Sequence, residues 1–215
     1  MKNKKNIWRF GIYLGGMIVL AIGITLNTKA GLGTSAIVSV PYTISCGTGW
    51  NFANLTLITY LILVVAQFFV KGKNKSWWDL LQIIVSIVFT RFMDLFQNII
   101  TYQNGKLIPD IIVLLFGIIF TGMGAAITVN MKLIPNPGDG IIASISDRTG
   151  KEMGLCKNCF DVGCVCISLI IGFFFGNLFL GVGLGTILSM IGVGRVISIF
   201  NRLTKKRLEE IAGLN

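Results

Sequence analysis

The stretch AIGITLNTK at residues 21–29 decides the fold, because a similar stretch, GAAITVNMK, follows at residues 124–132. The two stretches lie 103 residues apart, and this alignment pairs Thr25 with Thr128, Asn27 with Asn130, Lys29 with Lys132, and Gly47 with Gly150. A shift of one residue extends it to Arg91 with Arg195, Phe96 with Phe200, and Gln97 with Asn201. Weak internal symmetry in an apolar chain is typical of transporter folds built from two repeats. The sequence therefore predicts two copies of one structural unit, at about 8–100 and about 110–204.

The composition indicates a membrane protein. Of the 215 residues, 53% are hydrophobic and 13% are charged, and the mean hydropathy is +0.77, whereas a soluble domain has about 25% charged residues. We therefore expect one membrane domain, residues 1–215, whose surroundings are the lipid bilayer. The formal net charge is +10, but the Lys and Arg residues lie in short loops between apolar segments. Because they do not gather on one face, nucleic acid is not expected as a partner.

Six apolar segments approach or exceed the roughly 20 residues that a transmembrane helix needs. We place them at approximately 8–28, 52–70, 77–100, 110–131, 159–176 and 180–201. Two shorter segments, about 34–46 and 138–149, follow Gly- and Pro-rich breaks and contain polar residues. We expect these two to be short helices that re-enter the membrane or lie at its surface. The predicted fold is an all-α polytopic membrane protein.

The distribution of Lys and Arg predicts the orientation. With six spans and a cytoplasmic N-terminus, the outside loops contain only Lys29 and Lys106, and nearly all other loop Lys and Arg lie inside. This excess of positive charge favours six spans over eight and places both termini in the cytoplasm. Because each copy then has three spans, the second copy enters the membrane from the opposite face. The sequence predicts two inverted three-span repeats, the arrangement of alternating-access transporters.

Three stretches carry a resemblance to a known family: AGLGTSAIVSVPYTIS at 30–45, PNPGDGIIASISDRTG at 135–150, and VGLGTILSMIGVGRVISIFN at 182–201. Together they resemble the YczE/YyaS/YitT group of bacterial integral membrane proteins, and the YczE branch most closely. The resemblance implies a small multi-pass protein of the bacterial plasma membrane and supplies no reaction. Many members carry an aspartate in the first break as well as the second. Here Ala36 stands in the first break, and only Asp139 remains.

Two arginines are the sharpest candidates for a functional site. Arg91 and Arg195 lie deep in predicted spans, where a charged side chain is costly and usually faces protein or water. Asp94 is three residues from Arg91, so the two can form an ion pair on one helix face. We expect Arg91 to be buried and paired with Asp94. The functional interpretation gives each arginine a role in substrate binding or gating. The alternative is that the ion pair of Arg91 is only structural and that the Arg195 side chain lies at the membrane interface.

The breaks supply further candidates. Asp139 either caps the short helix that follows it or lines a site at the end of that helix. Asn27 and Asn130 occupy equivalent positions at the broken ends of two spans, where they either satisfy backbone groups or bind a ligand. Asp161 is spaced to pair with Lys157, and we interpret the two as a solvated pair at the membrane interface.

Metal and catalytic chemistry find little support. Cys156, Cys159, Cys164 and Cys166 lie in or beside an apolar run, and the chain contains no histidine. Buried cysteines of this kind are common without any metal. No nucleophile lies beside a base, so neither an enzyme nor a cofactor is expected.

We interpret the chain as a transporter-like or substrate-binding membrane protein for a small polar or charged solute. A polar cavity between the two breaks would hold the site, with Arg91, Asp94, Asp139, Arg195, Asn27 and Asn130 as candidate substrate-binding residues. The alternative is a non-transporting accessory or regulatory membrane protein whose buried polar residues are structural. A homo-oligomer or a partner membrane subunit fits either reading.

Overall fold

The computed structural model describes residues 2–214, which form helices and no strand. The first half contains α1 (Lys2–Lys29), α2 (Ala36–Thr48), α3 (Phe52–Lys71) and α4 (Leu81–Ile99). Two short 3-10 turns, η1 (Gly72–Asn74) and η2 (Trp77–Leu80), join α3 to α4. The second half contains α5 (Leu107–Asn130), α6 (Pro137–Thr149), α7 (Met153–Phe174) and α8 (Leu184–Ala212). The predicted all-α fold is confirmed, and each half has the order long, short, long, long.

The two short helices end in the same way. Each is followed by a glycine in the left-handed conformation, Gly49 after α2 and Gly150 after α6. The Gly49 N–H donates to the carbonyl of Ser45, and the Gly150 N–H donates to that of Ser146. Glycine adopts this conformation without strain, which explains its place at both helix ends. Gly49, two residues after the Gly47 that the sequence alignment paired with Gly150, therefore has the same place after its short helix as Gly150 has.

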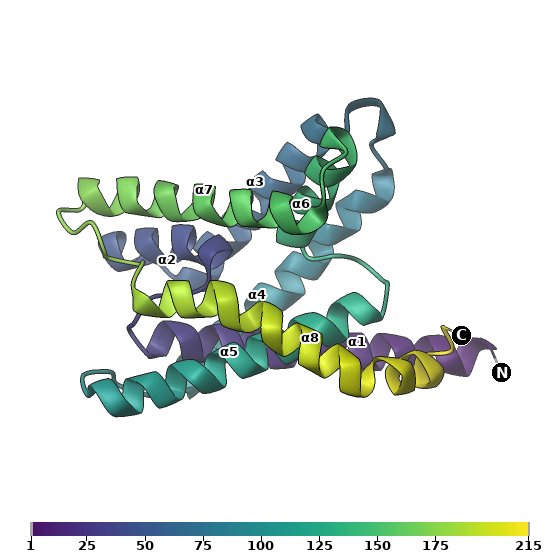
Figure 1. Cartoon of the computed structure of the whole chain (residues 1–215), viewed down its shortest axis with the longest axis horizontal. Coiled ribbons are helices and arrows are strands. Elements are labelled where there is room, and N and C mark those ends of the chain that lie inside the picture. Colours follow the sequence, from purple (N-terminus) through teal and green to yellow (C-terminus); the bar gives the residue numbers. More distant parts are fainter. Residues whose placement is uncertain (1, 215) are drawn as a thin grey trace.

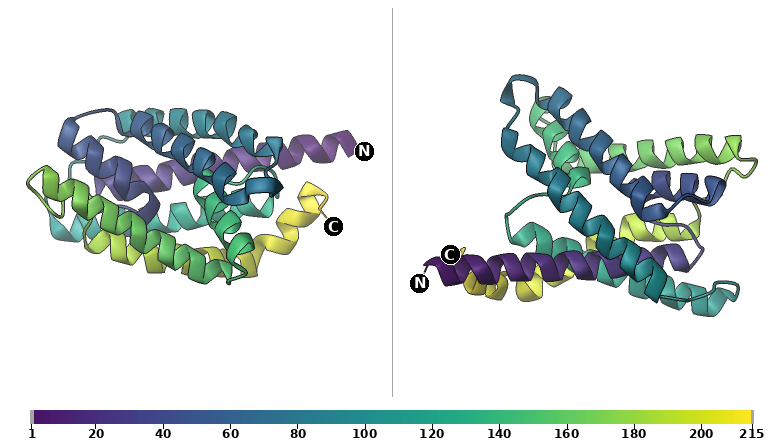
Figure 2. Two further views of the ribbon diagram at one scale, coloured as in Figure 1. Left: turned by 90° about the horizontal axis from the view of Figure 1, so that it is seen from above. Right: turned by 180° about the vertical axis from the view of Figure 1, so that it is seen from behind.

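The first helices of the two halves pack against each other in opposite directions. Near the start of α1, Arg9 bonds to backbone carbonyls at the end of α5. Just after α1, Gly31 lies against Asn104, which precedes α5. In Figures 1 and 2, α1, α5 and α8 form one layer, α2 and α7 lie across from it, and α4 runs obliquely between the two. Both chain ends lie at the same end of the molecule (Figure 1).

Glycines set the closeness of the α1–α5 contact. A Cβ added at Gly23 would meet the backbone of Thr121, and one added at Gly124 would meet the backbone of Leu20. A Cβ at Gly117 would likewise meet Asn27. Small residues allow helix backbones to approach in lipid, where no hydrophobic effect drives helices together.

The short helices pack across the two halves. α2 packs on α7, where the Ser39 and Ser168 hydroxyls are 2.7 Å apart. α6 packs on α3, where the Arg148 guanidinium donates to the carbonyls of Phe69 and Val70. Each short helix thus contacts the third helix of the opposite half.

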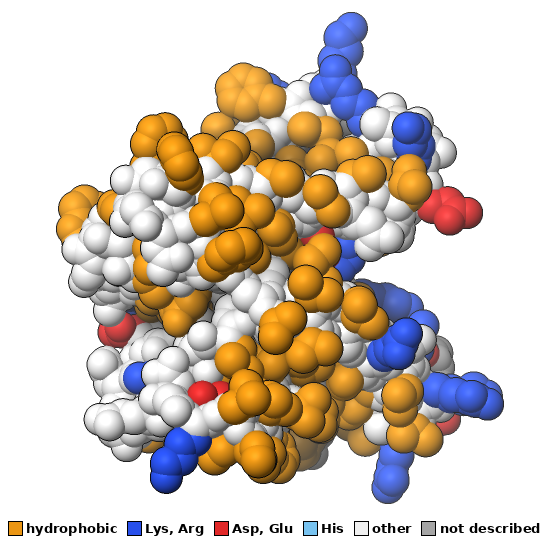
Figure 3. All heavy atoms as spheres, turned by 60° about the vertical axis from the view of Figure 1, so that its left-hand side comes forward, with side chains coloured by type: hydrophobic (Ala, Val, Ile, Leu, Met, Phe, Trp, Pro, Cys, Tyr) orange, Lys and Arg blue, Asp and Glu red, His pale blue; other side chains and the backbone are white. Residues whose placement is uncertain are grey.

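Within the described part of the chain, five helices are long and apolar enough to cross a membrane, namely α1, α3, α5, α7 and α8. α4, expected as a sixth span, is of similar length but carries Arg91, Asp94, Gln97 and Asn98 in its second half. It is not among the five. Large apolar side chains such as Phe69, Phe173 and Phe174 are exposed, as lipid-facing side chains are. On the face shown in Figure 3, hydrophobic side chains cover much of the middle, and most Lys and Arg project at one end.

The glycine packing makes a testable prediction. Gly124→Ala should lower the thermal unfolding midpoint of the purified protein, because the added methyl group overlaps the α1 backbone and overpacking costs about 1–3 kcal/mol. Gly15→Ala is the matched control, since a Cβ there meets nothing within 4 Å. The control should be neutral or slightly stabilising, because alanine favours a helix over glycine. Equal midpoints for the two variants would contradict the packing account.

Candidate functional site

The two breaks in the helices are held by polar contacts within the protein. In break 1, residues 30–35, the Leu32 carbonyl accepts a 2.7 Å hydrogen bond from the Gly185 N–H at the start of α8. In break 2, residues 131–136, the carbonyls of Met131 and Lys132 both accept hydrogen bonds from Arg9, each 2.7 Å long. Irregular backbone at membrane depth is tolerated where protein or water satisfies it. These contacts fix where α2 and α6 begin.

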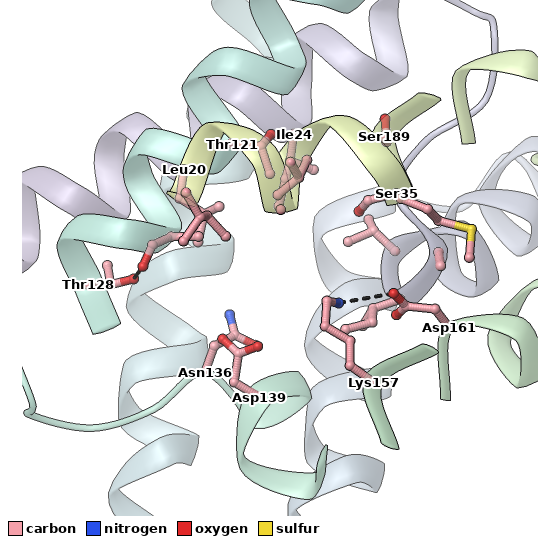
Figure 4. A pocket seen from close by; sticks show the side chains of 18 of the residues that line it. Leu20, Ile24, Ser35, Thr121, Thr128, Asn136, Asp139, Lys157, Asp161 and Ser189 are labelled. Carbon is pink, nitrogen blue, oxygen red and sulfur yellow. Dashed lines mark hydrogen bonds and ion pairs between the residues drawn. The ribbon is translucent and has the colours of Figure 1, made fainter. Parts of the chain in front are cut away.

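A cavity of about 140 Å³ lies between the N-terminal ends of these two short helices. The residues that precede them, Ser35 before α2 and Asn136 before α6, both line it. Its remaining walls come from α1, α3, α5, α7 and α8, and Figure 4 shows it from close by. A cavity is therefore present between the two breaks as predicted, but its wall is mostly apolar and includes neither Arg91 nor Arg195.

Asp139 lies in the first turn of α6 and lines this cavity. Its side chain makes no hydrogen bond or ion pair with the other residues that the structure describes. It does not cap α6, because that position belongs to Asn136, whose side chain accepts a 3.0 Å hydrogen bond from the Gly138 N–H. The capping alternative for Asp139 was wrong, and the carboxylate is left facing the cavity beside Asn136 (Figure 4).

Opposite Asp139, α7 contributes an ion pair. The Lys157 ammonium lies 3.0 Å from Asp161 Oδ2, and both residues line the cavity. The Asp161 side chain is 6% exposed and that of Lys157 is 43% exposed. The predicted pairing is confirmed, but the expected solvated setting is wrong, because Asp161 is buried in the protein. The second oxygen of Asp161, Oδ1, is buried without a hydrogen-bond partner.

The rest of the wall is mostly apolar. Leu20 and Ile24 of α1 and Met190, Val193 and Ile197 of α8 supply much of it. Ser189 adds a hydroxyl that is buried and has no hydrogen-bond partner. The cavity thus combines an aliphatic wall with a few polar groups, the usual makeup of a small-molecule site.

Arg91 and Asp94 lie elsewhere. Arg91 is exposed, and its guanidinium donates a 2.6 Å hydrogen bond to Asn54 Oδ1 in the first turn of α3. Asp94 accepts a 2.6 Å hydrogen bond from the Asn51 amide. The expected burial of Arg91 and its ion pair with Asp94 were wrong. Both partners belong to the start of α3, so Arg91 and Asp94 lie beside the N-terminal end of that helix and not beside its middle.

The other candidates also remain outside the cavity. Arg195 is exposed and follows the cavity-lining Gly194 without lining the cavity itself. Asn27 donates a 3.3 Å hydrogen bond to Thr121, and Asn130 donates a 2.7 Å hydrogen bond to Asn201. The two asparagines join neighbouring helices. Of the six residues expected to form the site, only Asp139 lines the cavity.

Two other features offer weaker sites. A hollow of about 400 Å³ is lined by Lys71, Lys73 and Arg148, but Lys71 is paired with Asp79 and Arg148 bonds to backbone carbonyls. Within the described part of the chain, all five cysteines are free and no cluster of three or more metal-ligating side chains occurs.

The sequence did not lead us to expect Lys157, Asp161 or Ser189 in the site. A signal for the first two was present, because an i,i+4 ion pair followed by a long apolar run marks charges at or inside a membrane helix. Nothing in the sequence distinguished Ser189, since serines on membrane helices commonly bond to their own backbone.

A profile described as "Family of unknown function (DUF6198)" matches residues 7–202. Two relatives come from Bacillus subtilis (strain 168). The uncharacterized membrane protein YczE is 24% identical over 153 residues, which cover 71% of this chain and 69% of YczE. The uncharacterized protein YyaS is 26% identical over 144 residues, or 64% of this chain and 70% of YyaS. The expected resemblance to the YczE-type group is confirmed. No solved structure matches the chain.

The ion pair between Lys157 and the buried Asp161 leads to a testable prediction. Lys157→Met should lower the free energy of unfolding by about 1–3 kcal/mol, because the buried Asp161 carboxylate loses its partner. The double variant Lys157→Met/Asp161→Leu should recover much of this loss, since no charge is then left unpaired. Lys132→Met is the control, because the Lys132 side chain is 61% exposed in its longer, 3.4 Å pair with Glu209 and pairs open to water contribute about 0–1 kcal/mol. A double variant less stable than Lys157→Met would contradict the pairing account.

Proposed function

The chain belongs to this family of unknown function, DUF6198, and we propose that it is a multi-pass protein of the bacterial plasma membrane that carries a small polar or charged solute. In this proposal the whole chain forms one membrane domain, catalyses no reaction, and binds its solute in the cavity between the breaks. The carrying observation is that cavity, into which the N-terminal ends of both short helices open and which contains Asp139, Lys157 and Asp161. Charges within membrane proteins usually mark a solute or ion pathway.

The relation between the two halves supports the proposal. α1 and α5 occupy the same place in their halves and run antiparallel, as the first helices of inverted repeats would. The contacts of the short helices follow the same relation, because exchanging the two halves turns the α2–α7 contact into the α6–α3 contact. Transporters with inverted repeats bind solutes at the repeat interface, beside discontinuous helices. We therefore assign the protein two inverted repeats, with α4 as the sixth span and both termini in the cytoplasm.

Four of the residues first expected to bind the solute have a structural role in this proposal: Asn27, Asn130, Arg91 and Asp94. The two asparagines hold neighbouring helices together. Arg91 and Asp94 bind the Asn51–Asn54 segment at the start of α3, where they hold the end of α4 against it. Solute binding falls to Asp139, with Lys157, Asp161 and Ser189.

Access to the cavity from both sides of the membrane tests the proposal. Ser189→Cys, in a chain whose own cysteines are replaced, should react with a membrane-impermeant thiol reagent. A protein that exposes its cavity alternately should react in right-side-out and in inverted vesicles.

Two variants control this experiment. Lys73→Cys should react from the cytoplasmic side alone and so reports vesicle orientation. Ile62→Cys should not react from either side, because Ile62 is 62% exposed on an apolar span and would face lipid. Reaction of Ser189→Cys from one side only, or from neither, would contradict transport and favour the accessory role.

A further inference from the structure

We infer that the solute is a small organic cation with an ammonium group on a short apolar body. This inference rests on the proposed function and deepens it, because it names the class of solute for the same cavity. It depends on the hydrogen-bonding groups that remain free in the cavity, on the sum of its charges, and on its walls.

Two buried side-chain atoms of the lining residues lack a hydrogen-bond partner, and both can accept a hydrogen bond. Asp161 Oδ1 is buried without a partner on a residue that is 4% exposed. Ser189 is 1% exposed, and its hydroxyl also lacks a partner. Asp139 adds a carboxylate that has no partner among the described residues. An ammonium group brings N–H donors to these acceptors, and burying them unpaired is costly.

The charges of the cavity point the same way. Lys157 and Asp161 neutralise each other across 3.0 Å, so an ionised Asp139 carboxylate gives the lining side chains one excess negative charge. A monovalent cation would balance that charge, and charge-assisted hydrogen bonds to carboxylates are among the strongest in proteins. The arginines that would attract an anion lie outside the cavity.

The walls select an organic cation over a metal ion. Leu20, Ile24, Val193 and Ile197 form an aliphatic surface that suits an alkyl body. A bare metal cation instead needs several oxygen ligands around it, and no cluster of metal-holding side chains exists among the described residues. The volume of about 140 Å³ is below the range of about 300–1,000 Å³ typical of drug-sized ligands. The solute is therefore smaller than a drug-sized molecule.

Binding can be measured by the thermal unfolding of the purified full-length protein at constant ionic strength. The probe is n-propylammonium chloride in place of sodium chloride. Sodium propionate and 1-propanol are the controls, because they keep a similar body but carry a negative charge or none. A ligand that binds the folded state raises the unfolding midpoint with its concentration. We expect a saturable rise of a few degrees with propylammonium and no comparable rise with either control.

Variants connect the effect to the cavity. Asp139→Asn should weaken propylammonium binding at least tenfold, and Asp139→Glu should retain part of it. Asp94→Asn should bind like the wild type, because it removes a carboxylate outside the cavity. An Asp139→Asn protein that binds as well as the wild type would overturn the inference.

The remaining outcomes separate this inference from the proposed function. Stabilisation by propionate in place of propylammonium would overturn the ammonium assignment and leave a solute site in place. Stabilisation by none of the probes would also overturn the assignment. The proposed function is tested separately, and it fails if Ser189→Cys reacts from one side only or from neither.

Discussion

Close antiparallel packing of α1 against α5 is the interaction on which the rest of the structure depends. Gly23, Gly117 and Gly124 bring the two backbones together. This contact places Arg9 of α1 beside the end of α5, where it satisfies two carbonyls of break 2. Unpaired backbone groups away from water cost several kcal/mol each in lipid. The packing of the first helices is therefore what allows the chain to break where α6 begins, and the break is what directs Asp139 into the cavity.

Positions that have the same place in their helices carry different chemistry in the two halves of the chain. Since α2 and α6 end alike, at Gly49 and Gly150, Val38 has the place in α2 that Asp139 has in α6. Counted from the first residues of α3 and α7, Phe52 and Met153, Tyr60 corresponds to Asp161 and Thr56 corresponds to Lys157. All of the cavity's charges thus come from the second half, while Val38 and Tyr60 of the first half supply wall. The two halves together enclose the cavity, and the second half alone supplies its charged side chains.

The sequence allowed much of the fold to be predicted, because its signals are local. Apolar length located the long helices, and glycine and proline located both breaks. The site was harder to predict, because it depends on how the helices pack. Arg91 was expected inside the bundle from its position in the chain, but α4 turns it toward Asn54 at the start of α3. Lys157 and Asp161 were interpreted as a solvated pair at the membrane interface, because their spacing alone does not show that the starts of α2 and α6 and part of α8 meet beside them.

The depth and hydration of the two helix starts test the central claim most directly. Spin labels at Ser35→Cys and Asn136→Cys, in a cysteine-replaced protein in lipid bilayers, report depth through their relative accessibility to oxygen and to a water-soluble nickel reagent. The account predicts that both labels lie at a similar depth near the middle of the bilayer and are accessible to the nickel reagent, because both helix starts border one polar cavity. Labels at headgroup level on opposite faces, or deep labels that the nickel reagent cannot reach, would contradict it.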